Sequence, residues 1–269
     1  MTEKIKLYDD SKCTACRGCQ LACKQWNALK ASQTENKGTY QNPPSLNANT
    51  FLPIHYQDYV DKDGSVKWLF RKEACMHCTD AACVTVCPSG ALHYNKETKT
   101  VGLDHDKCIG CKECVAACPF EIPRYDAATD KVYKCDMCES RITNGLDPAC
   151  VKACPTGALS WGLKDKMLKA AAKRVEKLGG DATTYGDKYV KGTHFMYVLK
   201  EKPAVYAGIH KDPSVPWSVT IWKGWLKPLS LLAAGGVLGG SFLHYMIHGP
   251  KYPDLPKDGD DAGHTEGGK

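Results

Sequence analysis

Sixteen cysteines dominate the chemistry of this 269-residue chain, and they fall into four groups of four. The most regular group is Cys108, Cys111, Cys114 and Cys118, followed directly by Pro119. Three thiolates separated by two residues can wrap a short loop around one [4Fe–4S] cube and reach three of its iron corners. The spacing therefore predicts iron–sulfur clusters.

The fourth cysteine of this group is placed differently from the first three. Cys114 and Cys118 are four positions apart, so on a helix they lie about one turn, or roughly 6 Å, apart along one face. We expect the two sulfurs to bind different cubes. Because proline cannot continue a helix interior, the helix should end at Pro119. One group would then serve two clusters.

The other three groups vary this pattern, and all keep three residues between their last two cysteines. The members are Cys13, Cys16, Cys19 and Cys23; Cys75, Cys78, Cys83 and Cys87; and Cys135, Cys138, Cys150 and Cys154. Four groups predict four [4Fe–4S] clusters in two ferredoxin-like modules, with the clusters of each pair exchanging their last ligand. Adjacency would pair group one with two and three with four, and a nested pairing is equally open.

Two other uses of cysteine fit less well. Cys-x2-Cys pairs also build structural zinc sites, but runs of three cysteines followed by x3-Cys suit zinc poorly. Disulfide scaffolds are typical of short secreted chains. Histidine replaces cysteine in some iron–sulfur centres, but four cysteines already satisfy each site. We therefore expect no ligand among His55, His77, His93 and His105.

The formal net charge of +6 counts every cysteine as neutral. Four oxidised clusters with thiolate ligands would add about −8 and leave the loaded protein near −2. Positive side chains beside the ligands should favour the reduced, more negative clusters. Those nearest in sequence are Lys12, Arg17, Lys24, Lys107, Lys112 and Lys134. No basic stripe with interleaved aromatics is present, so we expect no nucleic-acid partner.

Local patterns predict the elements that position the cysteines in an α+β fold. Residues 91–103 and 122–133 read as two hairpins, and residues 27–66, rich in Asn, Gln, Thr and Pro, read as a long loop or small inserted region. The segments 87–92 and 154–159 repeat a helix end, a glycine turn and a strand start. The apolar pattern of residues 164–178 predicts an amphipathic helix that ends at Gly179, and residues 195–199 are expected to form a buried strand.

The C-terminal region predicts one membrane span. Pro228 to Ile247 is a twenty-residue stretch without a charged residue, about 30 Å long as a helix, which matches a bilayer core. Its glycines, at 235, 236, 239 and 240, provide a smooth packing face. The numbers of lysines on the two sides of the span are almost equal, so the sequence does not show which end of the helix faces the cytoplasm.

His244 and His248 are one helical turn apart near the far end of the span. We expect their side chains to make polar contacts rather than to bind a haem. Interfacial aromatics flank the span at Trp217, Trp222, Trp225, Tyr245 and Tyr252.

Signals for other functions do not stand out. The first ten residues contain no apolar run and no arginine pair, so we expect no export signal there. No Ser/His/Asp arrangement, phosphate loop or dinucleotide fingerprint stands out. We therefore predict an electron-conducting subunit with no catalytic site of its own. A zinc-stabilised membrane interaction protein is the alternative from another class.

The cysteine groups, together with a tryptophan-rich segment before the span, resemble one known family over nearly the whole chain. That segment is Trp222-Lys223-Gly224-Trp225-Leu226-Lys227-Pro228, and His244-Tyr245 lies in the far part of the span. The family is the beta subunit of membrane-bound, quinone-linked formate dehydrogenase. The cysteine groups alone are similar to those of dimethyl sulfoxide, polysulfide, thiosulfate and nitrate reductase subunits, which remain the alternative within this class.

The resemblance implies nested modules, with group one paired with four and two with three. The first module would consist of residues 1–26 and 131–162, and the second of residues 75–130. Residues 27–74 would be an inserted loop region, and residues 163–222 would support the modules. The membrane anchor would be residues 223–250, followed by a polar tail at 251–269. The implied clusters are Cys13, Cys16, Cys19 and Cys154; Cys23, Cys135, Cys138 and Cys150; Cys75, Cys78, Cys83 and Cys118; and Cys87, Cys108, Cys111 and Cys114. Nitrate reductase subunits carry tryptophan where Cys111 stands, which argues against that branch.

The resemblance also implies partners in a larger hetero-oligomer. A molybdenum- or tungsten-pterin alpha subunit would oxidise formate, and a gamma subunit with b haems would pass the electrons to quinone. This chain would be a single-pass protein of the inner membrane in contact with lipid. Its cluster region would lie in the periplasm, exported with the alpha subunit. Which metal the pterin carries and the direction of electron flow are left open.

Overall fold

A four-stranded sheet, in the order β8-β1-β10-β9, is the frame of the cysteine-bearing unit. The computed structural model describes residues 3–36 and 38–249 and divides into two units, Met1–Thr220 and Ile221–Lys269. The sheet contains β1 (Lys4–Asp9), β8 (Leu159–Leu163), β9 (Thr183–Tyr185) and β10 (Phe195–Leu199). β1 and β10 are parallel, with Lys6 opposite Phe195, and the outer strands are antiparallel to them.

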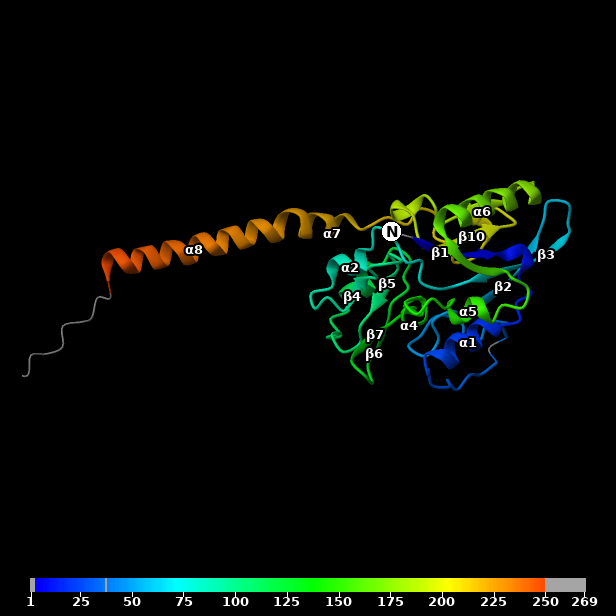
Figure 1. The fold of residues 1–269 in the computed structure, drawn as a ribbon, viewed down its shortest axis with the longest axis horizontal. Helices are drawn as coiled ribbons and strands as arrows, with labels where there is room; N and C mark the ends of the chain where they lie inside the picture. The colour runs from blue at the N-terminus through cyan, green and yellow to red at the C-terminus, as the bar shows by residue number, and fades with distance from the viewer. Residues whose placement is uncertain (1–2, 37, 250–269) are drawn as a thin grey trace, which may run out of the picture. The chain divides into compact units, whose positions relative to one another are not determined.

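One face of the sheet is covered by the amphipathic helix α6 (Lys164–Leu178), as Figure 1 shows. Ile5 and Leu7 from β1 and Met196 and Val198 from β10 pack against Ala171 of the helix. Fully burying each such aliphatic side chain contributes about 1.5–3 kcal/mol. The predicted helix bounds are confirmed, and Gly179 ends the helix with a φ of +64°.

The other face of the sheet points into the core that contains the cysteines. Tyr8, Phe195 and Tyr197 belong to this core, and the Tyr8 hydroxyl donates to the Phe70 carbonyl at 2.7 Å. β10 is buried along its whole length, as predicted. β1 is therefore covered on both faces, although its alternating sequence contains Lys6, which is fully buried.

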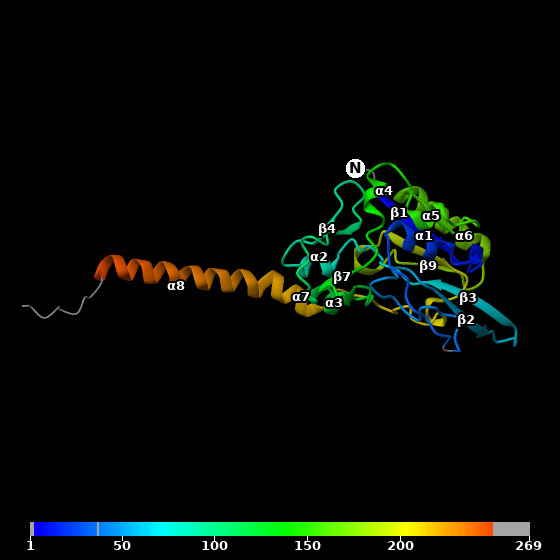
Figure 2. The ribbon, with the colours of Figure 1, turned by 90° about the horizontal axis from the view of Figure 1, so that it is seen from below.

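Three hairpins surround this core. β2 (Ile54–Val60) pairs with β3 (Val66–Lys72), β4 (Leu92–Tyr94) with β5 (Val101–Leu103), and β6 (Arg124–Asp126) with β7 (Lys131–Tyr133). The second and third confirm the hairpins predicted within residues 91–103 and 122–133. The first differs from expectation, because β2 lies inside residues 27–66, whose composition predicts a loop or small inserted region (Figure 2).

The short helices carry the later cysteines of each group. They are α1 (Gly18–Trp26), α2 (Ala82–Val86), α3 (Glu113–Ala117) and α5 (Ala149–Lys152), whereas α4 (Glu139–Ile142) begins directly after Cys138 and contains no cysteine. α3 stops before Pro119, as predicted, and α1, whose last cysteine is followed by Lys24 and not by proline, runs on to Trp26. α1 packs against α5, and α2 packs against α3, so the helices of the four groups pair in a nested order. Three single 3₁₀ turns complete the unit, η1 (Asp10–Lys12), η2 (Tyr189–Lys191) and η3 (Pro203–Val205).

The C-terminal helix runs from Trp217 to His248 and could cross a membrane by its length and composition, with a mean hydropathy of 1.4. It comprises α7 (Trp217–Ile221), the π-helical turn η4 (Trp222–Leu226) and α8 (Lys227–His248), which contains the predicted span. The His244 and His248 rings stack 4.3 Å apart near its end. The polar tail at 251–269, with Lys251, Tyr252 and Lys257, lies outside the described residues.

Candidate iron–sulfur sites

Three cysteines of group one and the last cysteine of group four line one cavity. We call Cys13, Cys16, Cys19 and Cys154 the Cys13 set. The loop from Cys13 to Arg17 turns through left-handed residues at Ala15 (φ 54°) and Arg17 (φ 60°). This turn directs the Ala15 N–H toward the Cys13 sulfur at 3.4 Å. Backbone N–H groups aimed at sulfur are the donors that stabilise a negatively charged cluster.

A second cavity gathers the first three cysteines of group three and the last cysteine of group two. Cys87, Cys108, Cys111 and Cys114 line it, and we call them the Cys87 set. Gly110 lies in the loop between two of these ligands with a φ of +67°. A Cβ at this position would collide with the backbone oxygen of Asp130, so the loop can close only with glycine there.

The third set, Cys23, Cys135, Cys138 and Cys150, is buried deeper, and we call it the Cys23 set. Burial raises the pKa of Cys23 well above its usual value, and the charges of the other three thiols raise it further. The pKa of Cys135 rises to about 11 and that of Cys138 to about 12, mainly through burial. The thiols whose charges act on Cys23 are thus those of group four, as the nested arrangement predicts.

The fourth set, Cys75, Cys78, Cys83 and Cys118, is identified in the same way, and we call it the Cys75 set. Burial raises the pKa of Cys78, and the three other thiols of the set raise it further. Burial also raises the pKa of Cys83 to about 12. Such thiols stay protonated unless a metal takes the place of the proton.

In every set, three sulfurs from one group meet the last cysteine of another group. Cys154 joins group one, Cys23 joins group four, Cys118 joins group two and Cys87 joins group three. Each of these four cysteines comes four positions after the preceding cysteine of its group, either in the same short helix or just beyond its end, as the x3 spacing predicts. Two of the four sets thus line cavities, and the charges that act on Cys23 and Cys78 agree with the other two. All sixteen thiols are free of disulfides.

The chemistry of the surroundings fits an anionic cluster in each set. Lys6 and Lys72 are fully buried, and among the described residues neither ammonium has a hydrogen-bond partner. A buried, unpaired positive charge is costly unless a negative charge lies nearby. Four thiolates around an oxidised [4Fe–4S] core carry such a charge. The donor set and the unpaired ammonium groups therefore both suit this cofactor.

These two lysines are the functional residues that sequence reasoning missed. Of the positive residues beside ligands in the sequence, Lys12 and Lys107 have side chains that are 46% and 63% exposed, and only Lys134 is buried. Lys6 and Lys72 are distant from the ligands in sequence, on β1 and β3. Both strands contain other charged residues, such as Lys4 and Arg71, so the local sequence does not single out these two lysines.

The histidines near the ligands have other partners. His77 Nδ1 accepts a hydrogen bond from the Val101 N–H at 3.1 Å, and burial lowers its pKa well below the usual value. The rings of His55, His93 and His105 contact Glu73, Glu139 and the Val132 carbonyl. Within residues 3–36 and 38–249, no group of three or more His, Cys, Asp or Glu side chains is spaced to hold a single metal ion.

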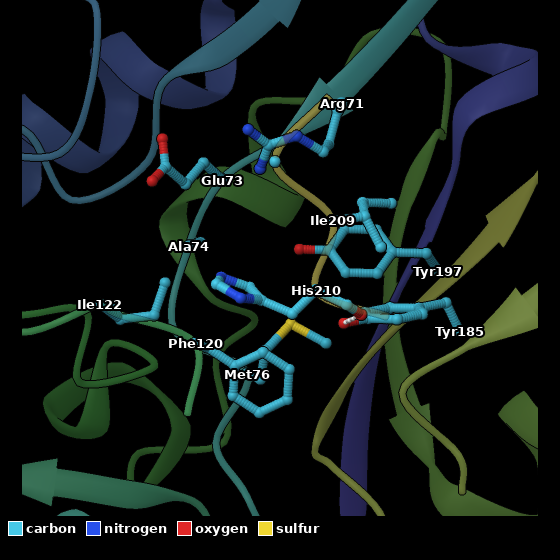
Figure 3. Close-up of a pocket in the computed structure, with 11 residues that line it drawn as sticks. Arg71, Glu73, Ala74, Met76, Phe120, Ile122, Tyr185, Tyr197, Ile209 and His210 are labelled. Carbon is cyan, nitrogen blue, oxygen red and sulfur yellow. Dashed lines mark hydrogen bonds between the residues drawn. The ribbon is translucent and has the colours of Figure 1, made fainter. Parts of the chain in front are cut away.

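A separate cavity contains no cysteine. Figure 3 shows Arg71 and Glu73 on one side of it and Met76 and Phe120 on the other, with His210 between them. The Tyr185 hydroxyl donates to the His210 carbonyl at 2.9 Å. Without sulfur ligands, this cavity is not a cluster site.

Comparisons with known proteins agree with these sites. Residues 66–164 match the family model of a 4Fe-4S dicluster domain, residues 10–26 that of a 4Fe-4S binding domain, and residues 215–255 that of the formate dehydrogenase N transmembrane segment. The nitrate-inducible formate dehydrogenase iron-sulfur subunit of Escherichia coli is 39% identical over 98% of this chain and 90% of its own length.

Two further relatives have the same kind of name. The formate dehydrogenase-O iron-sulfur subunit of Escherichia coli is 38% identical over 94% of this chain and 86% of its own length. The formate dehydrogenase 2 subunit beta (cytochrome c-553) of Nitratidesulfovibrio vulgaris is 39% identical over 76% of this chain and 96% of its own.

Proposed function

Because the chain belongs to the family of formate dehydrogenase iron–sulfur subunits, we propose that it conducts electrons through four [4Fe–4S] clusters and has no catalytic site of its own. Its general role, that of an electron-transfer subunit of a formate dehydrogenase, follows from the relatives that match nearly the whole chain. The observation that carries the proposal is that two cavities are each lined by four cysteines, three from one group and the last from another, among sixteen thiols that form no disulfide.

Each set supplies the ligands of one cluster in this proposal. The Cys13 and Cys23 sets form one module from residues 1–26 and 131–162, and the Cys75 and Cys87 sets form a second from residues 75–130. The packing of α1 on α5 and of α2 on α3 supports this nested division. Residues 163–222 support the modules through α6 and β10.

Electrons would enter at the Cys13 set and leave at the Cys87 set. Cys16 and Cys111, which are the exposed cysteines, belong to these two sets, while the Cys23 set is buried. Oxidation of formate to carbon dioxide releases two electrons and one proton in a catalytic subunit. A cluster held by each set would carry one electron at a time without a proton, and a quinone acceptor would take its protons from the surrounding water.

The partners are a molybdenum- or tungsten-pterin catalytic subunit and a cytochrome b subunit that reduces quinone. One relative's name mentions cytochrome c-553, but the helix Trp217–His248 and its match to a transmembrane family favour an acceptor in the membrane. We place the cluster unit on the periplasmic side of the inner membrane, exported with the catalytic subunit, in an anaerobic respiratory chain.

Metal analysis tests the proposal most directly. The anaerobically purified chain should contain about sixteen iron atoms and about sixteen acid-labile sulfides, which is the content of four cubes. Its broad visible absorption should bleach with dithionite. A colourless preparation with zinc in place of iron would favour a zinc-stabilised interaction protein instead.

A further inference from the structure

Three lysines are buried among the cysteine sets. Lys6 on β1 and Lys72 at the end of β3 are 0% exposed, and Lys134, which follows β7, is 3% exposed. The Lys134 ammonium donates to the carbonyls of Val101 at 2.7 Å and Cys135 at 2.9 Å. The ammonium groups of Lys6 and Lys72 have no such partner among the described residues.

The positive charges act on thiols of more than one set. Lys72 lowers the pKa of Cys13 and of Cys23 against the larger, opposing effect of burial. Lys6 acts in the same way on Cys135 of the Cys23 set and on Cys75 of the Cys75 set. Lys134 acts on three members of the Cys75 set. Lys72 and Lys6 therefore each act on two sets.

Lys6 is suited to remain charged in this position. Its ammonium is fully buried without a hydrogen-bond partner among the described residues, so it needs a negative group nearby to compensate its charge. Its ammonium also lies 4.0 Å from the centre of the Phe195 ring, in a cation–π contact that fixes its place on β1. Lysine offers a compact point charge here, where arginine would need several planar partners.

We propose that Lys6, Lys72 and Lys134 raise the reduction potentials of the clusters beside them by holding fixed positive charges in the dry interior. The proposal rests on the cluster content proposed above. When a cluster accepts one electron from its neighbour, the thiolate-ligated core changes from a dianion to a trianion and no proton is taken up. A nearby cation stabilises the trianion more than the dianion.

Burial makes this effect larger than that of surface lysines. Charges in a low-dielectric interior interact strongly and are little screened by salt, whereas exposed charges are screened by water and ions. Because Lys72 and Lys6 each act on two sets, each would raise two neighbouring potentials together. This would keep the potentials of successive clusters close along the row.

The test is a redox titration of the assembled complex, followed by electron paramagnetic resonance, for Lys6→Met and Lys72→Met. Methionine keeps much of the side-chain volume and removes the charge. We expect the equilibrium constant for reducing an adjacent cluster to fall at least tenfold, which is about 59 mV for a one-electron couple. Lys72→Met should shift the clusters of the Cys13 and Cys23 sets and leave that of the Cys87 set unchanged.

Lys107→Met is the matched control. Lys107 is adjacent to a cysteine of the Cys87 set, but its side chain is 63% exposed and paired with Asp104 at 2.9 Å. Its removal should change no equilibrium constant by more than about threefold, because water screens the charge.

Iron content separates the possible failures. If Lys6→Met and Lys72→Met keep the full iron content but leave every potential unchanged, the proposal is wrong. If one variant loses a cluster, the other variant provides the test, through the reduction potentials of the clusters beside the lysine that it replaces. A wild-type chain without iron would instead overturn the proposed function.

Discussion

Cys19 and Cys23 lie one helical turn apart in α1, yet their sulfurs belong to different sets. Cys19 lines the cavity of the Cys13 set, whereas the thiols whose charges raise the pKa of Cys23 belong to group four, on the packed helix α5 and the loop before α4. One short helix therefore spans two sites. The same relationship holds between Cys114 and Cys118 at the end of α3.

This geometry leads to an expectation for Cys23→Ser. The variant should lose or convert the cluster of the Cys23 set and retain that of the Cys13 set, because only the last cysteine of group one is changed. Cys16→Ser is the reciprocal control and should affect the Cys13 set alone. Electron paramagnetic resonance of the reduced variants distinguishes the two clusters. Loss of the Cys13-set signal alone in Cys23→Ser would refute ligand exchange.

Gly110→Ala should damage the site of the Cys87 set. The left-handed φ of +67° costs about 1 kcal/mol for alanine, and the added Cβ would also meet the Asp130 backbone, which cannot move away as a side chain can. We expect the chain to lose about four iron atoms, the content of one cube.

Gly90→Ala is the control for this change, because Gly90 also has a φ of +67° but nothing lies within 4 Å of the added Cβ. It should keep its iron with only a modest loss of stability. Equal iron loss in both variants would show that strain alone, and not the contact with Asp130, is responsible.

Asp10 should make stability depend on pH. Its carboxyl is 1% exposed, accepts a hydrogen bond from the Lys200 N–H at 3.0 Å and contacts the Tyr206 hydroxyl. Burial raises its pKa from 3.8 to about 6. The folded state therefore binds the proton more tightly than the unfolded state, so this stability is present below about pH 4 and is lost as the pH rises through about 6.

Asp10→Asn tests this dependence, because asparagine cannot ionise. The variant should match the wild type near pH 4 and exceed it by up to about 3 kcal/mol at pH 7. The midpoint temperature at which the cluster absorption bleaches, measured across this range, reports the difference. Asp63→Asn, at an exposed turn, should give no such gain. A gap between Asp10→Asn and wild type that does not grow with pH would contradict the expectation.

Ending the chain after Thr220 should separate cluster binding from membrane attachment. The helix Trp217–His248 contributes no buried residue, and the cysteines all lie in the unit Met1–Thr220. The shortened chain should keep the iron content of the full chain and move from washed membranes to the soluble fraction. Tight retention in the membrane without residues 221–269 would show that another surface provides the anchor.

Local signals were sufficient for much of the framework. The helix over 164–178 was predictable to its last residue, because its apolar period and the glycine after it act within a few turns. The hairpins at β4–β5 and β6–β7 follow from strand formers around polar turns. β2 was not predictable, because its polar and aromatic residues become a strand only by pairing with β3.

The positions of the lysines show the limit of such reasoning. Sequence proximity to the cysteines favoured Lys12 and Lys107, which are largely exposed. Lys6 and Lys72 approach the cysteine sets only because β1 and β3 pass beside segments that are far away in the chain. Spacing along the sequence cannot show which strand face meets which loop.

The chemistry of this protein could be inferred from short stretches of its chain, because ligand type, x2 and x3 spacing and a charge-free apolar stretch act over a few residues. Which groups meet could not, since adjacent and nested pairings have the same local pattern. The choice depends on long-range contacts: β1 pairs with β8 and β10, α1 packs on α5, and the sulfurs at opposite ends of the cysteine-rich region come together.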